Sequence, residues 1–429
     1  MADCISALPD DLLHHVLSFL PAHDAVRTCR LARRWRHLWK SAWALRVTGV
    51  KGCIDPERFF NFIDSLLLLR DPSAGLNSFE LDLDYDDFNF DLFEFLQMPA
   101  NELHVNTWIQ HALTCGPLMR LVLCTEVPLE LPNDPFISQH LTKLELRKLA
   151  ALHTTPHASS NGRSSDRSTI HPNGCPALLH LRVEDFYIWG NITSPFLKHL
   201  SIIYGHFLIG RFRARIYLPG LVSLELHCFY GRTPVLVESM PRLVSAFVRI
   251  NTCLDYCPNN DYGGCYDHQC DGCYGSQFGA DDRRGESVLL KGLSQVVTLE
   301  LWVHSKVVWM HACLDLKLCP TFSKLKSLLL SKRCPGIAGD LNILSCFLKH
   351  SPILEKLTLQ LSEEPKVPVE TQRSCTPSKQ SFAFSHLKIV EIKCDEVDER
   401  AHKVLDILST FNIPLEKVNI QRGNKTSGS

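Results

Sequence analysis

The chain has 429 residues, 45% hydrophobic and 21% charged, and its 45 basic residues almost balance its 46 acidic ones. This composition is globular, with enough apolar residues for a large core or for two domains. A formal net charge of -1 excludes binding driven by a strong overall field. A nucleic acid or a membrane surface would therefore need a local charged patch.

The first residues, MADCISALPDDLL, carry acids and a proline where a secretory signal needs a basic start and an apolar run. No stretch reaches the roughly 18 consecutive apolar residues of a membrane span. We therefore expect a soluble protein of the cytoplasm, the nucleus or both, without a membrane partner. Its 18 cysteines should be mostly reduced and buried.

Residues 5–47 predict three short helices. Pro9 suits a first helical turn, Pro21 ends the first apolar run, and Asp24 is a good N-cap for the second helix. A third helix would carry Trp35. Three helices within about 40 residues make a core of marginal stability. We therefore expect this module to be stabilised by contact with a partner or with the rest of the chain.

The spacing of LPDDLL, VL, LP, DAV and RRWRHLW across residues 8–39 closely resembles the F-box. The resemblance implies docking onto the small adaptor subunit of a cullin–RING ubiquitin ligase of the SCF type. The residues implied to make this contact are Leu8, Pro9, Leu12, Leu13, Val16, Leu17, Leu20, Pro21, Trp35, Leu38 and Trp39.

The segment 24–40 is also rich in arginine, and three helices are compatible with a helix-turn-helix DNA-binding domain. The rest of the chain adds no second basic surface for the phosphate contacts that such binding needs. We therefore do not expect a nucleic-acid partner.

From residue 76 onward one short pattern returns: apolar, two residues, apolar, one residue, apolar. In an x-L-x-L segment that forms a short parallel strand, every second side chain points into a core. A lone unit cannot cover its apolar face but stacked units can, so the pattern predicts an irregular leucine-rich-repeat solenoid. The twelve instances begin at Leu76, Leu118, Leu141, Leu178, Leu197, Leu221, Leu243, Val296, Leu325, Leu354, Leu387 and Leu415.

Three segments between these strands, 56–69, 101–115 and 339–350, predict helices that cover one side of the repeats. Residues 382–420 then read as a strand, an amphipathic helix and a final strand. This end resembles the FBD region of plant F-box proteins with irregular leucine-rich repeats. The helix would bury Ala401, Val404, Leu405 and Leu408.

The expected fold class is α/β: a small N-terminal three-helix F-box, then a solenoid of parallel strands with covering helices. We place the F-box at 1–47, the solenoid at 48–380, an FBD-like region that completes the solenoid at 381–421, and a disordered tail at 422–429. Polar insertions are expected at 153–174 and 251–287.

The second insertion holds five cysteines between residues 253 and 273. Two thiolates three residues apart can face one tetrahedral zinc ion, and two more would close a structural site that orders the loop. Reduced thiols in a flexible loop, or a redox disulfide, are the alternatives. No cofactor is otherwise required. The candidate zinc ligands are Cys257, Cys265, Cys270 and Cys273.

Motifs of catalysis are missing from the sequence: it has no phosphate loop, dinucleotide fingerprint, nucleophile elbow or H-E-x-x-H. The acids that begin at Asp82 alternate with leucines, which is typical of the solvated face of a strand. We therefore expect a non-catalytic receptor that positions an unknown target protein near the ligase, whose cullin scaffold is the further partner. A non-degradative scaffold or a degenerate family member is the alternative. Residues expected to face the target are Glu80, Arg147, Arg182, Glu225, His227 and Trp302.

Overall fold

The computed structural model of the chain divides into two compact units, unit 1 (residues 1–187) and unit 2 (residues 188–429). It describes residues 5, 8–48, 56–83, 99–124, 138–148, 175–188, 191–207, 214–231, 234–237, 240–250, 289–303, 319–332, 337–361, 386–394, 397 and 399–422. Within these ranges, no helix combines the length and the apolar character that crossing a membrane demands.

Unit 1 begins with the three predicted helices, α1 (Asp10–Leu17), α2 (Ala22–Arg27) and α3 (Trp35–Leu38). Single 3-10 turns follow the last two, at Thr28–Arg30 and Trp39–Ser41. Pro9 and Pro21 each stand directly before a helix with ψ near 150°, so each proline sets the entry into the helix. The second helix therefore begins at Ala22, and the expected start at Asp24 was wrong.

Unit 1 continues as a parallel sheet in which neighbouring strands follow chain order. Phe79, Leu121, Leu144 and Leu181 share one register row, so the leucines of successive repeats stack on one face. All four side chains are buried. The strands are β1 (Ala44–Val47), β2 (Ser78–Asp82), β3 (Arg120–Cys124), β4 (Lys143–Arg147) and β5 (His180–Glu184).

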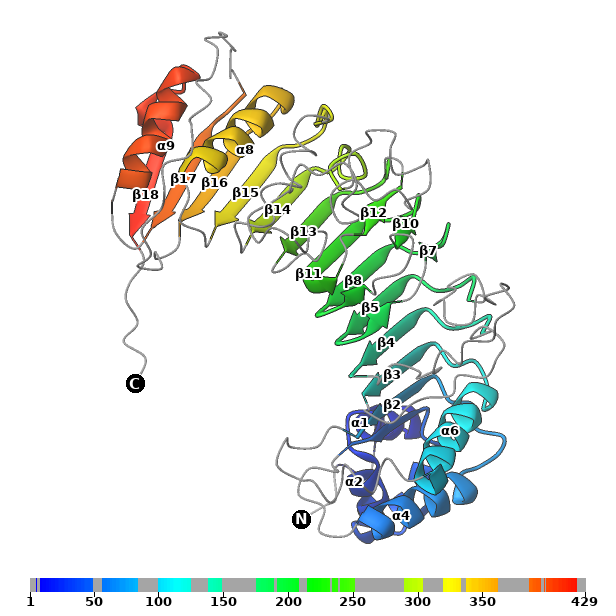
Figure 1. The fold of residues 1–429 in the computed structure, drawn as a ribbon. Coiled ribbons are helices and arrows are strands. Elements are labelled where there is room, and N and C mark those ends of the chain that lie inside the picture. Colours follow the sequence, from blue (N-terminus) through cyan, green and yellow to red (C-terminus); the bar gives the residue numbers. More distant parts are fainter. Residues whose placement is uncertain are drawn as a thin grey trace, which may run out of the picture. The chain divides into compact units, whose positions relative to one another are not determined.

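Two predicted helices of unit 1, α4 (Pro56–Leu69) and α6 (Pro99–Thr114), contact each other beside the sheet (Figure 1). The buried Trp108 packs its ring 4.8 Å from that of Phe60. Its indole Nε1 donates a hydrogen bond of 2.6 Å to Oδ1 of Asp64. The polar end of a large buried ring thus has a partner, as burial of an indole requires.

Unit 2 continues the same strand pattern, and its main strands are also parallel and in chain order. Leu224, Ala246, Leu299, Leu328, Leu357 and Val390 form its buried register row. The strands are β8 (His199–Ile203), β11 (Ser223–Gly231), β13 (Ser245–Ile250), β14 (Thr298–Val303), β15 (Ser327–Lys332), β16 (Lys356–Leu361), β17 (Ile389–Cys394) and β18 (Val418–Arg422).

Helices α8 (Ile337–His350) and α9 (Glu399–Thr410) lie next to each other along β15–β18, on one side of the sheet (Figure 1). Ala401, Val404 and Leu408 of α9 are buried, and Leu405 is half-buried. A 3-10 turn at Leu415–Lys417 leads into β18, which closes the series. The expected order of strand, helix and strand is confirmed.

All twelve instances of the repeated pattern form strands, β2–β5, β8, β11 and β13–β18. The α/β fold class with helices before parallel repeats is likewise confirmed. Shorter strands were not predicted: β6 (Tyr187–Ile188), β7 (Ile192–Thr193), β9 (His206–Phe207), β10 (Arg215–Tyr217) and β12 (Val235–Leu236). Both insertions, 153–174 and 251–287, and residues 423–429 of the tail lie outside the described residues.

Candidate docking surfaces

The N-terminal helices have a small core of their own. Leu13 and Leu17 of α1 pack with Trp35 and Leu38 of α3, and all four are buried. These four residues were expected to touch a partner. Their side chains instead hold the three helices together, so they can support a contact surface but do not form one in this conformation.

The exposed residues of α1 include two apolar side chains among charged and polar ones. Leu12 and Val16 lie one turn apart and are 48% and 43% exposed. Phe19, just after the helix, is 61% exposed, and Leu31 is 69% exposed. Fully burying an exposed side chain of this kind is worth about 1.5–3 kcal/mol, and these four have roughly half of that area left to bury, so they are candidate docking residues.

The other residues expected to contact the adaptor differ in how exposed their side chains are. Leu8 and Leu20 are half-buried and pack against the small core. Pro9 is exposed, whereas Pro21 and Trp39 are half-buried. Trp39 also lies 5.7 Å beneath the ammonium group of Lys40.

The arginine-rich segment does not form one continuous helix. It is divided among α2, a 3-10 turn and α3, which interrupts any single basic helical face. Arg34 is also paired with Asp10 at 2.5 Å, and Arg27 approaches Asp24 at 3.6 Å. These pairs lower the local positive charge that a phosphate backbone would meet.

The helical module is joined directly to the first repeats. Strand β1 lies inside the predicted 1–47 boundary and pairs in parallel with β2. Arg46 donates a 2.9 Å hydrogen bond to the carbonyl of Phe19 and also pairs with Glu80 at 3.2 Å. The buried Arg70, at the end of α4, donates to the carbonyl of Ala42 at 2.9 Å. Burial lowers the pKa of this guanidinium.

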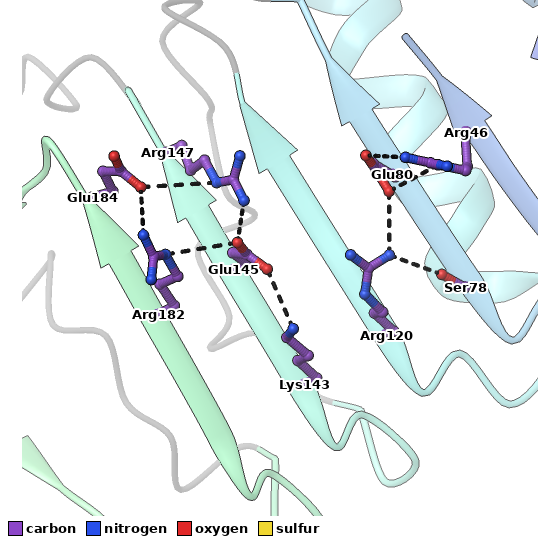
Figure 2. Close-up of polar contacts among 9 residues, drawn as sticks. All are labelled: Arg46, Ser78, Glu80, Arg120, Lys143, Glu145, Arg147, Arg182 and Glu184. Carbon is purple, nitrogen blue, oxygen red and sulfur yellow. Dashed lines mark hydrogen bonds and ion pairs between the residues drawn. The ribbon is translucent and has the colours of Figure 1, made fainter. Parts of the chain in front are cut away.

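The second candidate surface is the strand face opposite the buried leucines, which we call the open face. In unit 1 it carries charged residues on neighbouring strands (Figure 2). Glu80 lies between Arg46 and Arg120, each at 3.2 Å. Glu145 accepts a short hydrogen bond from Arg147. Arg182 then bridges Glu145 at 3.7 Å and Glu184 at 3.1 Å.

Two carboxylates of this open face are favoured as anions by their neighbours. Burial would raise the pKa of Glu145, but the hydrogen bond and charge of Arg147 and the charges of Lys143 and Arg182 outweigh it. Burial opposes ionisation of Glu80 too, and Arg46 and Arg120 outweigh it there. The pKa of each carboxyl group is therefore lowered, and the pKa of the Arg147 guanidinium is raised by Glu145.

The open face of unit 2 has a different chemistry. The ring of His227 stacks on Tyr204 at 6.0 Å and meets the edge of Phe247 at 5.4 Å. Arg249 places one nitrogen 3.2 Å from Nε2 of His227 and its guanidinium carbon 5.6 Å from the Trp302 ring. This aromatic row offers a target protein large rings and one cation, a combination common in binding surfaces.

The six residues expected to face a target all lie on the open face of their unit: Glu80, Arg147 and Arg182 in unit 1, and Glu225, His227 and Trp302 in unit 2. Glu225 accepts a hydrogen bond of 2.5 Å from Ser201. Glu145 and the aromatic neighbours Tyr204 and Phe247 of His227 were not predicted from the sequence. Charged residues at alternate positions in KLELR, residues 143–147, are the signal that could have found Glu145.

The candidate zinc ligands Cys257, Cys265, Cys270 and Cys273 lie outside the described residues, so that site stays a prediction. Of the acidic stretch only Asp82 and the buried Leu83 are described. Asp82 ends β2 on the open face, as the alternation predicted.

Comparison with known families gives a match to the F-box domain at residues 5–45. The chain is 29% identical over 251 residues to the F-box/LRR-repeat protein At2g42720 of Arabidopsis thaliana, covering 53% of this chain and 54% of that protein. It is 28% identical over 432 residues to the MEIOTIC F-BOX protein MOF of Oryza sativa subsp. japonica, covering 91% and 80%.

A third relative, the FBD-associated F-box protein At5g56370 of Arabidopsis thaliana, is 32% identical over 152 residues, covering 34% of this chain and 32% of that protein. No solved structure matches the chain significantly. The chain therefore carries an F-box domain followed by parallel repeats, and it is similar to plant F-box proteins with leucine-rich repeats. It spans about half the length of the first of these relatives and a third of the last.

Proposed function

We propose that the chain is a non-catalytic substrate receptor of an SCF-type cullin–RING ubiquitin ligase. The observation that carries the proposal is the coincidence of the F-box match at residues 5–45 with exposed apolar side chains on α1. An apolar helix face of this kind suits the groove of a partner protein. Leu12 and Val16 would make the central contact with the adaptor subunit, through which the chain reaches the cullin scaffold.

The target protein would bind the open strand faces. Repeats present many side chains over an extended surface, so a receptor can read a protein without a deep pocket. The aromatic row of unit 2 supplies the apolar part of this contact, with Trp302 and Phe247 as its main anchors. The paired charges of unit 1 would select partners by charge pattern, because a mismatched charge leaves a nearly buried ion unpaired.

The chemistry of ubiquitin transfer would then belong to other subunits. The receptor contributes by raising the effective concentration of target lysines near the charged ubiquitin, which lowers the entropic cost of the encounter. This role requires no cofactor of its own, and it places the protein in the cytoplasm, the nucleus or both.

Proximity labelling from the chain in cells with blocked proteasomes tests the proposal. Leu12→Ala with Val16→Ala should remove the adaptor and cullin from the labelled set but keep the target, because the repeats are unchanged. Leu68→Ala is the matched control, since Leu68 is 85% exposed on α4 and lies outside the proposed contact. Equal adaptor labelling by the double variant would refute the docking surface. If the labelled target proteins keep the same cellular levels when the chain is deleted, the result would favour a non-degradative scaffold over a substrate receptor.

A further inference from the structure

Unit 2 also contains a cluster of side chains that are soft metal ligands. Cys319, Cys346 and His350 each bring one ligand atom to within 4.8 Å of the other two. No other set of three or more candidate ligands meets this condition among the described residues.

The fold fixes where these three side chains meet. Cys346 and His350 lie four residues apart in the last turn of α8, so both side chains point to the same side of the helix. Cys319 comes from the segment before β15. The amide of Phe322 donates a 2.8 Å hydrogen bond to the carbonyl of His350, which ties that segment to the helix end. The buried rings of Phe322 and Phe347 pack at 5.2 Å beneath this tie.

We propose that Cys319, Cys346 and His350 form a site for a soft divalent cation, with zinc as the natural occupant. Thiolate and imidazole ligands select zinc over magnesium or calcium, which prefer oxygen. Around a tetrahedral zinc ion, sulfur and nitrogen ligands lie about 3.5–3.8 Å apart.

The observed geometry is close to this requirement. Sγ of Cys346 is 3.7 Å from Nδ1 of His350, and the 4.8 Å bound on the set leaves about an ångström for closure. Nδ1 also lies 2.9 Å from the carbonyl oxygen of Cys346. Coordination through Nδ1 exchanges this hydrogen bond for a metal bond. The three protein ligands leave a fourth position, which water fills.

The chain offers a matched control. His111 and Cys115 are also four residues apart at the end of a helix, α6, and Sγ of Cys115 is 3.1 Å from Nε2 of His111. This pair lacks a third ligand among the described residues. A thiol–imidazole pair alone should therefore bind a metal far more weakly than the proposed three-ligand site.

The test uses the full chain, freed of metal by a chelator under reducing conditions and titrated with Co²⁺, whose thiolate charge-transfer absorption reports bound sulfur. The wild type should bind one Co²⁺ ion that Zn²⁺ displaces. The Cys346→Ser variant should lose this binding. Cys319→Ser and His350→Gln should each weaken binding at least tenfold, and Cys115→Ser should change nothing. The double variant Cys270→Ser with Cys273→Ser removes two ligands of the site predicted at 253–273 and leaves the proposed site intact. Co²⁺ bound by this variant is therefore assigned to the proposed site.

Circular dichroism checks the fold of every variant. If the Cys346→Ser variant unfolds, the Co²⁺ affinities of Cys319→Ser and His350→Gln test the proposal. Both positions are only partly buried, so we expect these two variants to fold. The proposal is overturned if the wild type binds no Co²⁺. It is also overturned if binding survives all three ligand substitutions but disappears in the 270/273 variant.

Discussion

Glu145 is a carboxylate only 5% exposed, placed on β4 among Lys143, Arg147 and Arg182. The three cations are partly exposed, so the buried charge here is the carboxylate, and leaving it without their compensation would be far more costly than losing a surface pair. The residue therefore acts as the centre of the charge network in unit 1, and its neighbours on β4 and β5 depend on it.

The lowered pKa of Glu145 makes part of the stability of unit 1 dependent on pH. A carboxyl group with a depressed folded pKa contributes fully above its unfolded pKa, about 4.3, and this contribution falls as pH drops below that value. Glu145→Gln should therefore destabilise the protein at pH 7, and its deficit relative to wild type should shrink below about pH 4. Urea unfolding followed at both pH values measures the effect.

Glu416→Gln provides the comparison for this pH series, because Glu416 is exposed in the 3-10 turn before β18. It should leave the pH profile unchanged. A Glu145→Gln deficit that stays constant from pH 7 down to pH 3 would show that packing, and not charge, accounts for the loss.

Helix α1 carries both buried and exposed apolar side chains, and we expect them to have different roles. Leu13 is fully buried, and Leu12 beside it is 48% exposed. Leu13→Ala should cost about 2–5 kcal/mol of local stability, as large-to-small core changes do, whereas Leu12→Ala should stay within about 0.5 kcal/mol. Hydrogen exchange of the amides in residues 8–47 of the full chain would measure the difference. Equal protection in the two variants would mean that the helix faces are assigned wrongly.

The turns between repeats set how closely successive strands can stack. Gly220 stands in one such turn of unit 2, and a Cβ atom there would lie 2.5 Å from the carbonyl oxygen of Pro195. Gly220→Ala should therefore destabilise unit 2 by about 1–3 kcal/mol, the usual range for overpacking. In Gly75→Ala, by contrast, the new Cβ would make an ordinary 3.4 Å contact with Pro117.

Thermal unfolding of both glycine variants tests this packing. The melting temperature should fall for Gly220→Ala and stay near that of wild type for Gly75→Ala. A melting temperature of Gly220→Ala equal to wild type would show that the turn can open without loss.

Across the whole molecule, the predictable parts are those with a strong period. The twelve strands followed from the repeated leucines, and helix α4 has the predicted bounds. The unpredicted β7, β10 and β12 have two or three residues each, too short to show an alternation. Their pairing depends on tertiary register, which joins Ile192, Ile216 and Leu236, far apart in the chain.

The candidate docking surface could be predicted from the sequence as a segment but not as a set of side chains. Leucines that enter the module's own core and leucines that face a partner have the same helical spacing, so the sequence could not separate Leu13 from Leu12. Burial in the folded chain separates them. Likewise Leu45 and Val47 alternate as in any strand, but only the pairing with β2 shows that the sheet starts inside the F-box domain.

The most direct test of the receptor role is a titration of the purified full chain with a purified ligase adaptor subunit. We expect a one-to-one complex that Leu12→Ala with Val16→Ala weakens at least tenfold, since each lost central contact costs more than about 1 kcal/mol. The receptor role would be contradicted if the folded wild-type chain does not bind the adaptor at micromolar concentrations. It would also be contradicted if the double variant binds as tightly as wild type.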